Sequence, residues 1–380
     1  MPAGLPPAFF KEGNMNEFIK GADLSSLIEV ENCGGKFYDG GAEGDAMEIL
    51  RRHGVNLVRL RIWNDPKDEN GASYGAGSNC FDVTAALAKR AVSLGMKWML
   101  DFHYSDFWAD PGKQFLPKAW REMSADEITS AVYDFTKETL EKLGTAGILP
   151  DFVAVGNEIT NGLLWPYGKA PNFENIARFV GAGIRAVRAA APRSKVVLHL
   201  DNGGKNALYR EWFENYFAAG GADFDVMGLS YYPFWHGTMP ELAFNLSDME
   251  RRYGKEMIVV ETSMGFSLDD YSEYEGFPAG TIGSGIVNEE LAKIVDYSLT
   301  KDGQREFLTD LVKTIKGVSR GRGFIWWEPA WIPVRGSGWT SPAGLKYVGE
   351  DGICANLWAN QALFDFDGNA LPALYEIEKM

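Results

Sequence analysis

Two glutamates in this 380-residue chain each end a short apolar run. Glu158 follows Phe152–Val155 and the dipeptide Gly156-Asn157, and Glu261 follows the run Met257–Val260. Short runs of this kind, rich in β-branched residues, are typical of strands that are buried on both faces. One polar strand end usually does no more than meet solvent. The same pattern at a second strand favours the hypothesis of a paired carboxylate site.

Two carboxyl groups that flank an acetal oxygen suffice for the hydrolysis of a glycosidic bond. One, held protonated, donates to the leaving oxygen, and the other attacks the anomeric carbon, with about 5–5.5 Å between them in retaining enzymes. We assign Glu158 as the general acid/base and Glu261 as the nucleophile. Asn157 is expected to contact the hydroxyl next to the anomeric carbon. A hydrogen bond there strengthens in the transition state and lowers the barrier.

Two further side chains are expected near the nucleophile. Arg61 is predicted to lie buried beside Glu261, where a fixed positive charge would keep the carboxylate ionised. An ordinary ion pair of the fold remains open for Arg61. Tyr231 is expected to donate to Glu261 as well.

Eight strand-like runs must position these residues, and helical segments alternate with them. Helices are predicted at 45–52, 82–94, 124–143, 172–190 and 240–253, several of them ending at a glycine. Eight strand–helix repeats in one undivided chain predict an α/β protein with a single (β/α)₈ TIM barrel. A doubly wound sheet is the alternative, but no Gly-rich phosphate loop follows the first strand. The expected strands are 18–24, 55–62, 97–103, 152–155, 195–201, 225–232, 256–263 and 322–329.

The ends of the predicted strands are polar or aromatic, whereas the residues before them are mostly aliphatic. In a (β/α)₈ barrel the active site lies at the C-terminal ends of the strands, so this rim is the expected site. Tryptophans near strand ends and in loops favour a sugar, because pyranose rings stack on exposed indoles. The remaining candidate substrate contacts are Trp63, Asp65, His103, Asp106, Trp108, His199, Asp201, Trp327 and Trp331.

Composition excludes several classes of protein. A net charge of −15 does not supply the basic face that nucleic acid requires, so a neutral substrate is favoured. No apolar run approaches the length of a membrane span. The absence of HExxH, CxxC and GxSxG patterns weighs against metalloprotease, zinc-site and serine-hydrolase chemistry. Residues 1–16 are interpreted as an N-terminal extension to a catalytic barrel at 17–380. They do not read as a signal peptide, although a chain trimmed of its export signal would look the same.

The motifs together resemble glycoside hydrolase family 53, the endo-β-1,4-galactanases of the clan A retaining glycosidases. The resemblance covers nearly the whole chain, and its specific blocks are GADLSS, RIWNDP, HYSDFWADP and GNEITNGLLWP. It implies cleavage of internal β-1,4-galactosidic bonds in pectic (arabino)galactan or galactooligosaccharides, with Glu158 and Glu261 in the roles given above. It also implies a monomer that needs no cofactor and acts outside the cell, at its surface or in the periplasm.

Bacterial members of that family often hold calcium in the loop after the seventh strand. Here the loop offers Asp269, Asp270 and Glu273, with Glu275 beside them, but lacks the alternating acidic/His/Asn spacing that the resemblance implies. Structural calcium and simple solvation of these carboxylates both remain open.

Two other functions remain open. Another clan A glycanase, such as a mannanase or cellulase, would use the same residue types, because specificity depends on the orientation of sugar hydroxyls. A non-catalytic carbohydrate-binding barrel is the third hypothesis, and the presence of both carboxylates argues against it.

Overall fold

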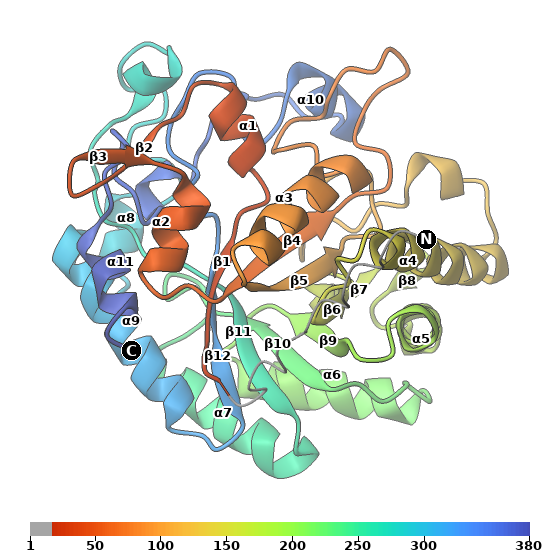
Figure 1. The fold of residues 1–380 in the computed structure, drawn as a ribbon. Coiled ribbons are helices and arrows are strands. Elements are labelled where there is room, and N and C mark those ends of the chain that lie inside the picture. The colour runs from red at the N-terminus through yellow and green to blue at the C-terminus, as the bar shows by residue number, and fades with distance from the viewer. Residues whose placement is uncertain (1–16) are drawn as a thin grey trace, which may run out of the picture.

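The computed structural model describes residues 17–380, and eight parallel strands form a closed barrel at its centre (Figure 1). The expected extension at 1–16 lies outside the described residues. The barrel strands pair in chain order, and the last pairs with the first, so the predicted (β/α)₈ barrel is confirmed. They are β1 (Ile19–Asp23), β4 (Leu57–Ile62), β5 (Lys97–Phe102), β6 (Phe152–Val155), β9 (Lys195–Leu200), β10 (Val226–Ser230), β11 (Glu256–Thr262) and β12 (Gly321–Trp326).

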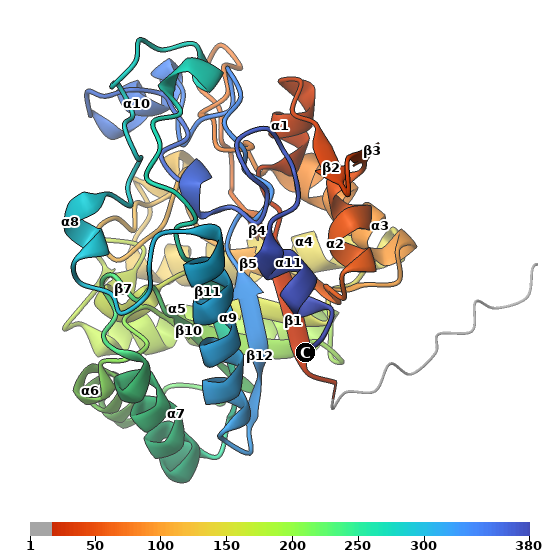
Figure 2. The ribbon, with the colours of Figure 1, turned by 90° about the vertical axis from the view of Figure 1, so that its left-hand side faces the viewer.

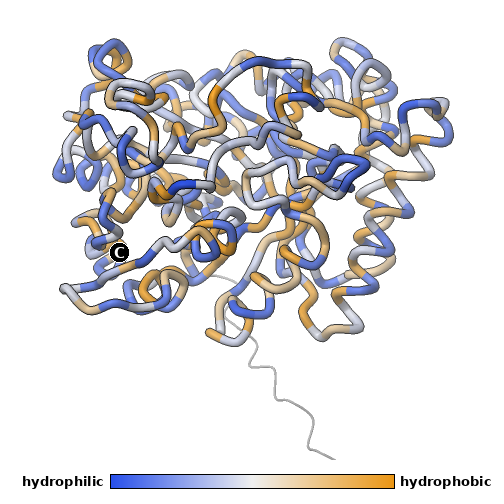
Figure 3. The backbone as a smooth tube through the Cα atoms, turned by 90° about the horizontal axis from the view of Figure 1, so that it is seen from above, coloured by the Kyte–Doolittle hydropathy of each residue, from blue (hydrophilic) through white to orange (hydrophobic). Residues whose placement is uncertain are grey.

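The helices surround the barrel, and hydrophobic and hydrophilic residues alternate along the outer ones (Figure 3). The five predicted helices are confirmed to within about two residues at each end. Helix α6 and helix α9 were not predicted. The helices are α1 (Leu27–Asn32), α2 (Ala46–Arg52), α3 (Phe81–Ser93), α4 (Ala125–Thr145), α5 (Phe173–Ala190), α6 (Asn206–Ala218), α7 (Met239–Tyr253), α8 (Glu289–Ala292), α9 (Lys301–Lys316), α10 (Pro342–Val348) and α11 (Pro372–Ile377).

Local sequence explains where the helices begin and end. Ser124 and Glu127 form a capping box at the start of α4, which satisfies backbone N–H groups that have no partner in the first turn. Thr238 and Glu241 do the same for α7, which ends at Gly254 in the left-handed conformation. Among residues 17–380 no helix has the length and apolar character of a membrane span.

Two apolar layers hold the barrel together. One lies between the strands and the outer helices and contains most of the buried aliphatic side chains. The other fills the barrel interior, from Ile19 and Leu57 through Ala154 to Ile258 and Ile325. Polar side chains are therefore displaced toward the ends of the strands.

Loops at the C-terminal ends of the strands carry additional small elements, and α10 lies at this end of the barrel (Figure 2). The segment 276–300 that precedes α9 is a long loop with one short helix, α8. The remaining elements are the strand pairs β2 (Phe37–Asp39) with β3 (Ala42–Gly44) and β7 (Gly162–Leu163) with β8 (Gly168–Lys169), and the 3₁₀ helices η1 (Lys118–Trp120), η2 (Ile159–Asn161), η3 (Ser272–Glu275) and η4 (Ala359–Gln361).

Candidate active site

The two glutamates lie together at the C-terminal rim. One carboxyl oxygen of Glu158, one of Glu261 and one ring nitrogen of His199 all lie within 4.8 Å of one another. Both glutamates are nearly buried, with 8% of Glu158 and 6% of Glu261 exposed. This spacing fits the pair of carboxyl groups in a retaining glycosidase and leaves less room than the inverting arrangement needs.

The backbone is strained where the strands meet the site. Glu158 follows β6 with φ of 47°, in the left-handed region that side chains other than Gly rarely adopt. Tyr104 after β5, Asn202 after β9 and Glu328 after β12 also have positive φ. Such residues cluster at functional sites because the surrounding structure must hold them in place.

Glu261 has a cation and a phenol as partners. Arg59 Nη2 lies 2.8 Å from Glu261 Oε1, and the Tyr232 hydroxyl donates to Oε2 at 3.0 Å. Burial raises the pKa of Glu261, and the charge of Arg59 opposes that effect, so that the pKa is about 7. The positive charge of Arg59 therefore favours the ionised form of this carboxyl.

Arg59 also joins Glu261 to three other strand ends. Its guanidinium contacts Asp23 at 2.7 Å and Asp101 at 2.8 Å, and it donates to Asn157 Oδ1 at 2.7 Å. Burial alone would raise the pKa of Asp101, but Arg59 brings it down to about 2. Asp23 and Asp101 thus hold the guanidinium in a fixed position beside Glu261.

The expected position of Arg61 is wrong. Arg61 Nη1 lies 2.5 Å from Glu328 and 3.8 Å from Asp23, and Nη2 donates to the carbonyl of Ala76. Arg59 and Arg61 are two residues apart in β4, so both face the barrel interior but at different heights. The arginine one layer deeper reaches Glu261. The ordinary ion pair left open for Arg61 is what the structure shows.

The expected contact of Tyr231 with Glu261 is also wrong. The Tyr231 hydroxyl donates to the carbonyl of Gly237, and its ring packs against Phe307 on the outer side of the sheet. Tyr232 takes the predicted place. Val226, Ser230 and Tyr232 lie at alternate positions and face the barrel interior, so Tyr231 between them faces outward. The irregularity lies in β11, where the pairing with β10 skips Val260 and so brings Glu261 to the side of Tyr232.

Glu158 has a different environment from Glu261. Its Oε1 lies 2.6 Å from Ser230 Oγ, and no arginine or lysine forms an ion pair with it among residues 17–380. Burial, Glu261 and Asp201 all raise the pKa of Glu158 well above its ordinary value. Asp201 itself is buried, with Oδ2 held by Asn202 and with Oδ1 unpaired.

The two histidines are supports beneath the rim. His103 Nε2 lies 3.1 Å from Asp101, and its Nδ1 accepts from the indole of Trp63 and the backbone N–H of Ala109. His199 contacts Asn157 and Ser230 through its two ring nitrogens. Every ring nitrogen of both residues has a protein partner, so both act as supports of neighbouring side chains, and their direct contact with a substrate stays a prediction.

The predicted aromatic contacts divide by burial. Trp63 and Trp331 are 0% and 1% exposed, so neither presents an open ring face to a sugar, and their contact with substrate stays a prediction. Trp108 and Trp327 are half-buried, with ring centroids 5.9 Å apart. Trp327 also packs at 4.7 Å against Trp358, which with Tyr232 and Trp235 extends an aromatic wall beside Glu261.

The two aspartates from the early loops lie in one small network. Asp65 is exposed and pairs with Lys118 at 3.1 Å. Asp106 is buried and accepts from the backbone N–H groups of Asp65 and Lys118. Asp106 therefore holds the loops after β4 and β5 together. Both its carboxylate oxygens already accept hydrogen bonds from the protein, and its contact with substrate stays a prediction.

Asp269 and Asp270 in the loop after β11 are engaged in hydrogen bonds within that loop, and structural calcium there stays a prediction. Asp270 accepts from the N–H groups of Ser272 and Gly280, and Asp269 accepts from Ser267. In the described part of the chain, the only group of three or more His, Cys, Asp or Glu side chains close enough to share an ion is Glu158, His199 and Glu261. The acidic loop residues stabilise the loop through their own hydrogen bonds.

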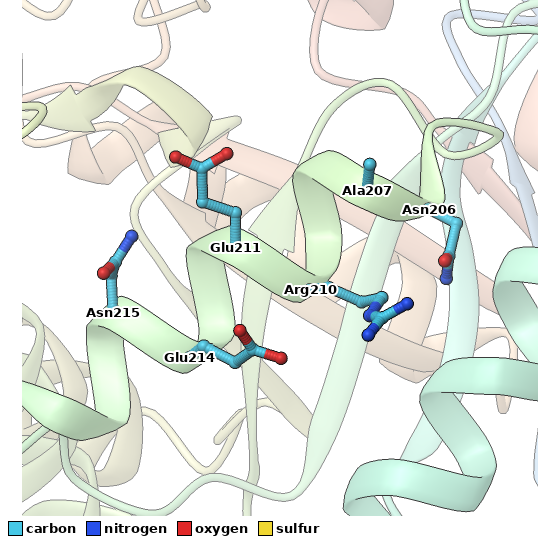
Figure 4. A pocket seen from close by; sticks show the side chains of 6 residues that line it. All are labelled: Asn206, Ala207, Arg210, Glu211, Glu214 and Asn215. Carbon is cyan, nitrogen blue, oxygen red and sulfur yellow. The ribbon is translucent and has the colours of Figure 1, made fainter.

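A pocket elsewhere lacks comparable features. It measures about 320 Å³ and lies on α6, and all six lining residues come from that one helix (Figure 4). Figure 4 shows the side chains of Arg210, Glu211 and Glu214 projecting from this helix. The chemistry is concentrated at the barrel rim.

Several residues of the site were not predicted as site residues: Asp23, Arg59, Asp101, Ser230, Tyr232 and Glu328. The available signal was the run LVRLRI, in which two arginines occupy alternate positions of an otherwise apolar strand. A charged residue in a buried strand requires an opposite charge nearby.

Comparison with known proteins gives a consistent result. The family model for glycosyl hydrolase family 53 matches residues 19–377. An endo-beta-1,4-galactanase of Bacillus subtilis is 37% identical, over 96% of this chain and 86% of that protein. An arabinogalactan endo-beta-1,4-galactanase A of Aspergillus niger is 37% identical, over 82% of this chain and 85% of its own length.

Solved structures show the same relationship. A family 53 catalytic domain from Ignisphaera aggregans superposes with a TM-score of 0.86 and 38% identity, over 96% of this chain and 97% of that domain. A fungal beta-1,4-galactanase gives a TM-score of 0.76 at 32% identity, over 95% of this chain and 98% of the other.

Proposed function

The chain belongs to glycosyl hydrolase family 53, and from that membership we propose that Glu158 is its general acid/base and Glu261 its nucleophile. The protein is a glycoside hydrolase of the endo-β-1,4-galactanase type, acting on β-1,4-galactan. The single observation that carries the assignment of roles is the position of Arg59, which lies 2.8 Å from Glu261.

The charges around the pair distinguish the two roles. A nucleophile must be ionised, and the guanidinium beside Glu261 stabilises its charge. A general acid must be protonated, and Glu158 has three acidic neighbours, Glu261, Asp201 and Asp110, and no ion pair with an arginine or lysine of the described residues. When two close carboxyls share one proton, that proton is therefore favoured on Glu158.

The proposed reaction has two steps. In the first, Glu261 attacks the anomeric carbon while Glu158 gives its proton to the glycosidic oxygen, which leaves with the departing chain. In the second, the Glu158 carboxylate takes a proton from water while the water oxygen attacks the anomeric carbon. The bond from that carbon to Glu261 breaks, and the Glu261 carboxylate is released. Two displacements at one carbon retain its configuration.

Asn157 supports this proposal as a contact for the sugar 2-hydroxyl. Its Oδ1 already accepts from Arg59 and His199, and one hydrogen of Nδ2 goes to the carbonyl of Ala109. The second Nδ2 hydrogen is left to donate to a sugar. Trp327 and Trp108, half-buried beside the carboxylates, supply the stacking surfaces.

The substrate is tested by reducing-end release from linear galactan, from mannan and from carboxymethylcellulose. We expect release from galactan to be at least tenfold faster than from either of the others. Faster release from mannan or carboxymethylcellulose would place the enzyme among the other clan A glycanases, and no release from any of them would support a non-catalytic barrel.

The role of Glu158 is tested by Glu158→Ala on two substrates. A general acid contributes about 10²–10⁴-fold, and this contribution is needed only when the leaving group is poor. Hydrolysis of galactan should fall by that factor, whereas cleavage of an aryl galactoside with an acidic phenol should fall far less. Equal losses on both substrates would contradict the assignment.

The place of action is proposed from the size of the substrate. A galactan polymer does not cross a membrane, so the enzyme is expected to act outside the cytoplasm. Galactanase activity in the medium of the producing cells, compared with washed cells and lysate, is the measurement. Activity confined to the lysate would contradict this expectation.

A further inference from the structure

We propose that Ser230 is a positioning residue for the acid/base, with a hydroxyl that donates to His199 and accepts a hydrogen bond from the protonated carboxyl of Glu158. The inference rests on the proposed role of Glu158. It concerns a buried chain of three contacts, from Asn157 Oδ1 to His199 at 2.8 Å, from His199 to Ser230 Oγ at 2.7 Å, and from Ser230 Oγ to Glu158 Oε1 at 2.6 Å.

The direction of the chain is set at its far end by Asn157. The guanidinium of Arg59 can only donate, and it lies 2.7 Å from one end of the Asn157 amide, so that atom is the oxygen. The other end of the amide lies 2.8 Å from the carbonyl of Ala109, which can only accept, so that atom is the nitrogen. His199 therefore faces the amide oxygen.

The tautomer of His199 follows. Its Nδ1 lies 2.8 Å from Asn157 Oδ1, so Nδ1 must carry a hydrogen, because two lone pairs at that distance would repel. Burial, and next the charge of Arg59, lower the pKa of His199 well below its ordinary value, so the ring is neutral. A neutral ring with its hydrogen on Nδ1 has a bare Nε2, and Ser230 must donate to it.

The remaining contact places a proton on Glu158. Ser230 has one hydroxyl hydrogen, and His199 receives it. The 2.6 Å contact between Ser230 Oγ and Glu158 Oε1 then requires the carboxyl to be the donor. If Glu158 loses its proton, the hydroxyl can turn to the carboxylate, but His199 Nε2 is then left buried without a donor.

The charged groups around the chain act in the same direction. Glu158 faces Glu261 from β11, Asp201 from the end of β9 and Asp110 from the loop after β5. All three are acidic and disfavour its ionisation.

His199 faces Arg59 from β4, His103 after β5 and His236 after β10, which disfavour a cation. Asp101 favours one, but Arg59 neutralises it at 2.8 Å, and of the two carboxyls within 4.8 Å of the ring, Glu261 is paired with Arg59 and Glu158 is protonated in this arrangement. The chain therefore holds Glu158 as an acid at rest and makes its carboxylate more basic in the second step of the reaction.

The tautomer can be read directly by ¹⁵N NMR of the imidazoles in the resting enzyme, since the chain has four histidines. We expect His199 to carry its hydrogen on Nδ1, and its Nε2 resonance to move with pH along the basic limb of kcat/KM without a second proton being bound. A hydrogen on Nε2, or an imidazolium at the pH of activity, would overturn the proposal.

The sign of a pH shift gives a second test. In Ser230→Ala we expect the basic limb of kcat/KM to move to lower pH by about one unit, because the protonated form of Glu158 loses its acceptor. A hydroxyl that simply donated to ionised Glu158 would produce a shift to higher pH, which would overturn the proposal, as would no shift at all. Ser230→Thr keeps the hydroxyl and should keep the parent profile, and melting temperatures check that both variants fold.

Failure of the proposed function is distinguishable from failure of this inference. The tautomer of His199 is measured without turnover, whereas the leaving-group dependence of Glu158→Ala tests Glu158 as the acid. A Nδ1–H ring together with equal losses on both substrates would contradict only the role of Glu158. A Nε2–H ring together with the expected leaving-group dependence would contradict only the role of Ser230.

Discussion

At the scale of single residues, one arginine determines how the proton is shared between two carboxyls. Arg59 touches Glu261, Asp23 and Asp101, and it does not touch Glu158. One positive charge among several acidic groups stabilises the nearest anions, and the carboxyl outside its reach retains the proton. The chemical difference between two otherwise similar glutamates comes from this asymmetry.

Arg59→Lys tests this explanation while keeping a positive charge in the barrel. Lysine cannot reproduce the planar fork that contacts several strand ends, so Glu261 should lose part of its stabilisation. We expect kcat/KM to fall by about 10²-fold and the acidic limb of its pH profile to move to higher pH, because a less stabilised carboxylate has a higher pKa.

Arg61→Lys is the matched control, two residues along the same strand. Arg61 pairs with Glu328 and not with Glu261, so its variant should leave the acidic limb where it is in the parent. A larger shift of that limb in Arg61→Lys than in Arg59→Lys would contradict the geometry.

Adjacent tyrosines offer a second comparison. Tyr232→Phe removes the donor to Glu261, and a hydrogen bond to a charged group contributes about 1.5–3 kcal/mol, so kcat/KM should fall about 10–100-fold. Tyr231→Phe removes a bond to the carbonyl of Gly237 and should lower stability by about 1 kcal/mol with little effect on rate. Steady-state kinetics and urea unfolding on both variants measure the two effects, and a reversed pattern would refute the assignment.

At the scale of elements, small irregularities of the strands determine which side chains enter the site. The register shift skips Val260 of β11 and so brings Glu261 to the face of the barrel that Tyr232 reaches. Residues in the left-handed conformation turn the chain at the strand ends, and Glu158 and Glu328 are two of them. Both features place functional side chains where a regular strand would not.

The loop after β11 contains a buried acid outside the catalytic pair. Glu275 is 4% exposed, and both its oxygens accept from the backbone N–H of Asn356, at 3.0 and 2.9 Å. Burial raises its pKa to about 8. The contact ties the loop after β11 to the segment before η4.

Glu275 should make stability depend on pH. Between its ordinary pKa of 4.5 and about 8, the folded chain keeps a proton that the unfolded chain has lost, so stability falls as pH rises through that window. Glu275→Gln cannot ionise and should remove this slope. As the pH rises from 5 to 8, we expect the melting temperature of the variant to rise by a few degrees relative to that of the parent. This corresponds to a relative change in the free energy of unfolding of about 1–3 kcal/mol.

Glu273→Gln is the control for that measurement, since Glu273 is exposed on the same 3₁₀ helix. Its melting temperature should follow that of the parent at every pH. If the difference in melting temperature between Glu275→Gln and the parent is the same at every pH, the raised pKa of Glu275 is contradicted.

At the scale of the whole molecule, the sequence was sufficient for the barrel and for the carboxylate pair. Apolar runs such as Phe152–Val155 read as strands because parallel strands are buried on both faces. The closure of eight of them then brings Glu158 and Glu261 together. Helix α9 was not predicted although its buried residues Phe307, Leu308, Leu311, Val312 and Ile315 recur at helical spacing.

The contacts of Glu261 could not be predicted from the sequence, because they depend on distances across the barrel. The stagger of the strands decides whether Arg59 or Arg61 meets Glu261, and a register shift in β11 turns Glu261 to the side of Tyr232. Both are set by pairing between segments far apart in the chain. The burial of Trp63 is of the same kind, since neighbouring loops cover an indole that its own strand would leave at the rim.

The central claim assigns different roles to the two carboxyls, and azide rescue tests it most directly. With an activated aryl galactoside, small anions can replace a missing carboxylate. Glu158→Ala should regain activity in azide and yield the β-galactosyl azide, because azide attacks the intermediate on Glu261 from the face that water uses. Glu261→Ala should yield the α-galactosyl azide, because azide takes the place of the nucleophile. The α-azide from Glu158→Ala, or the β-azide from Glu261→Ala, would contradict the assignment.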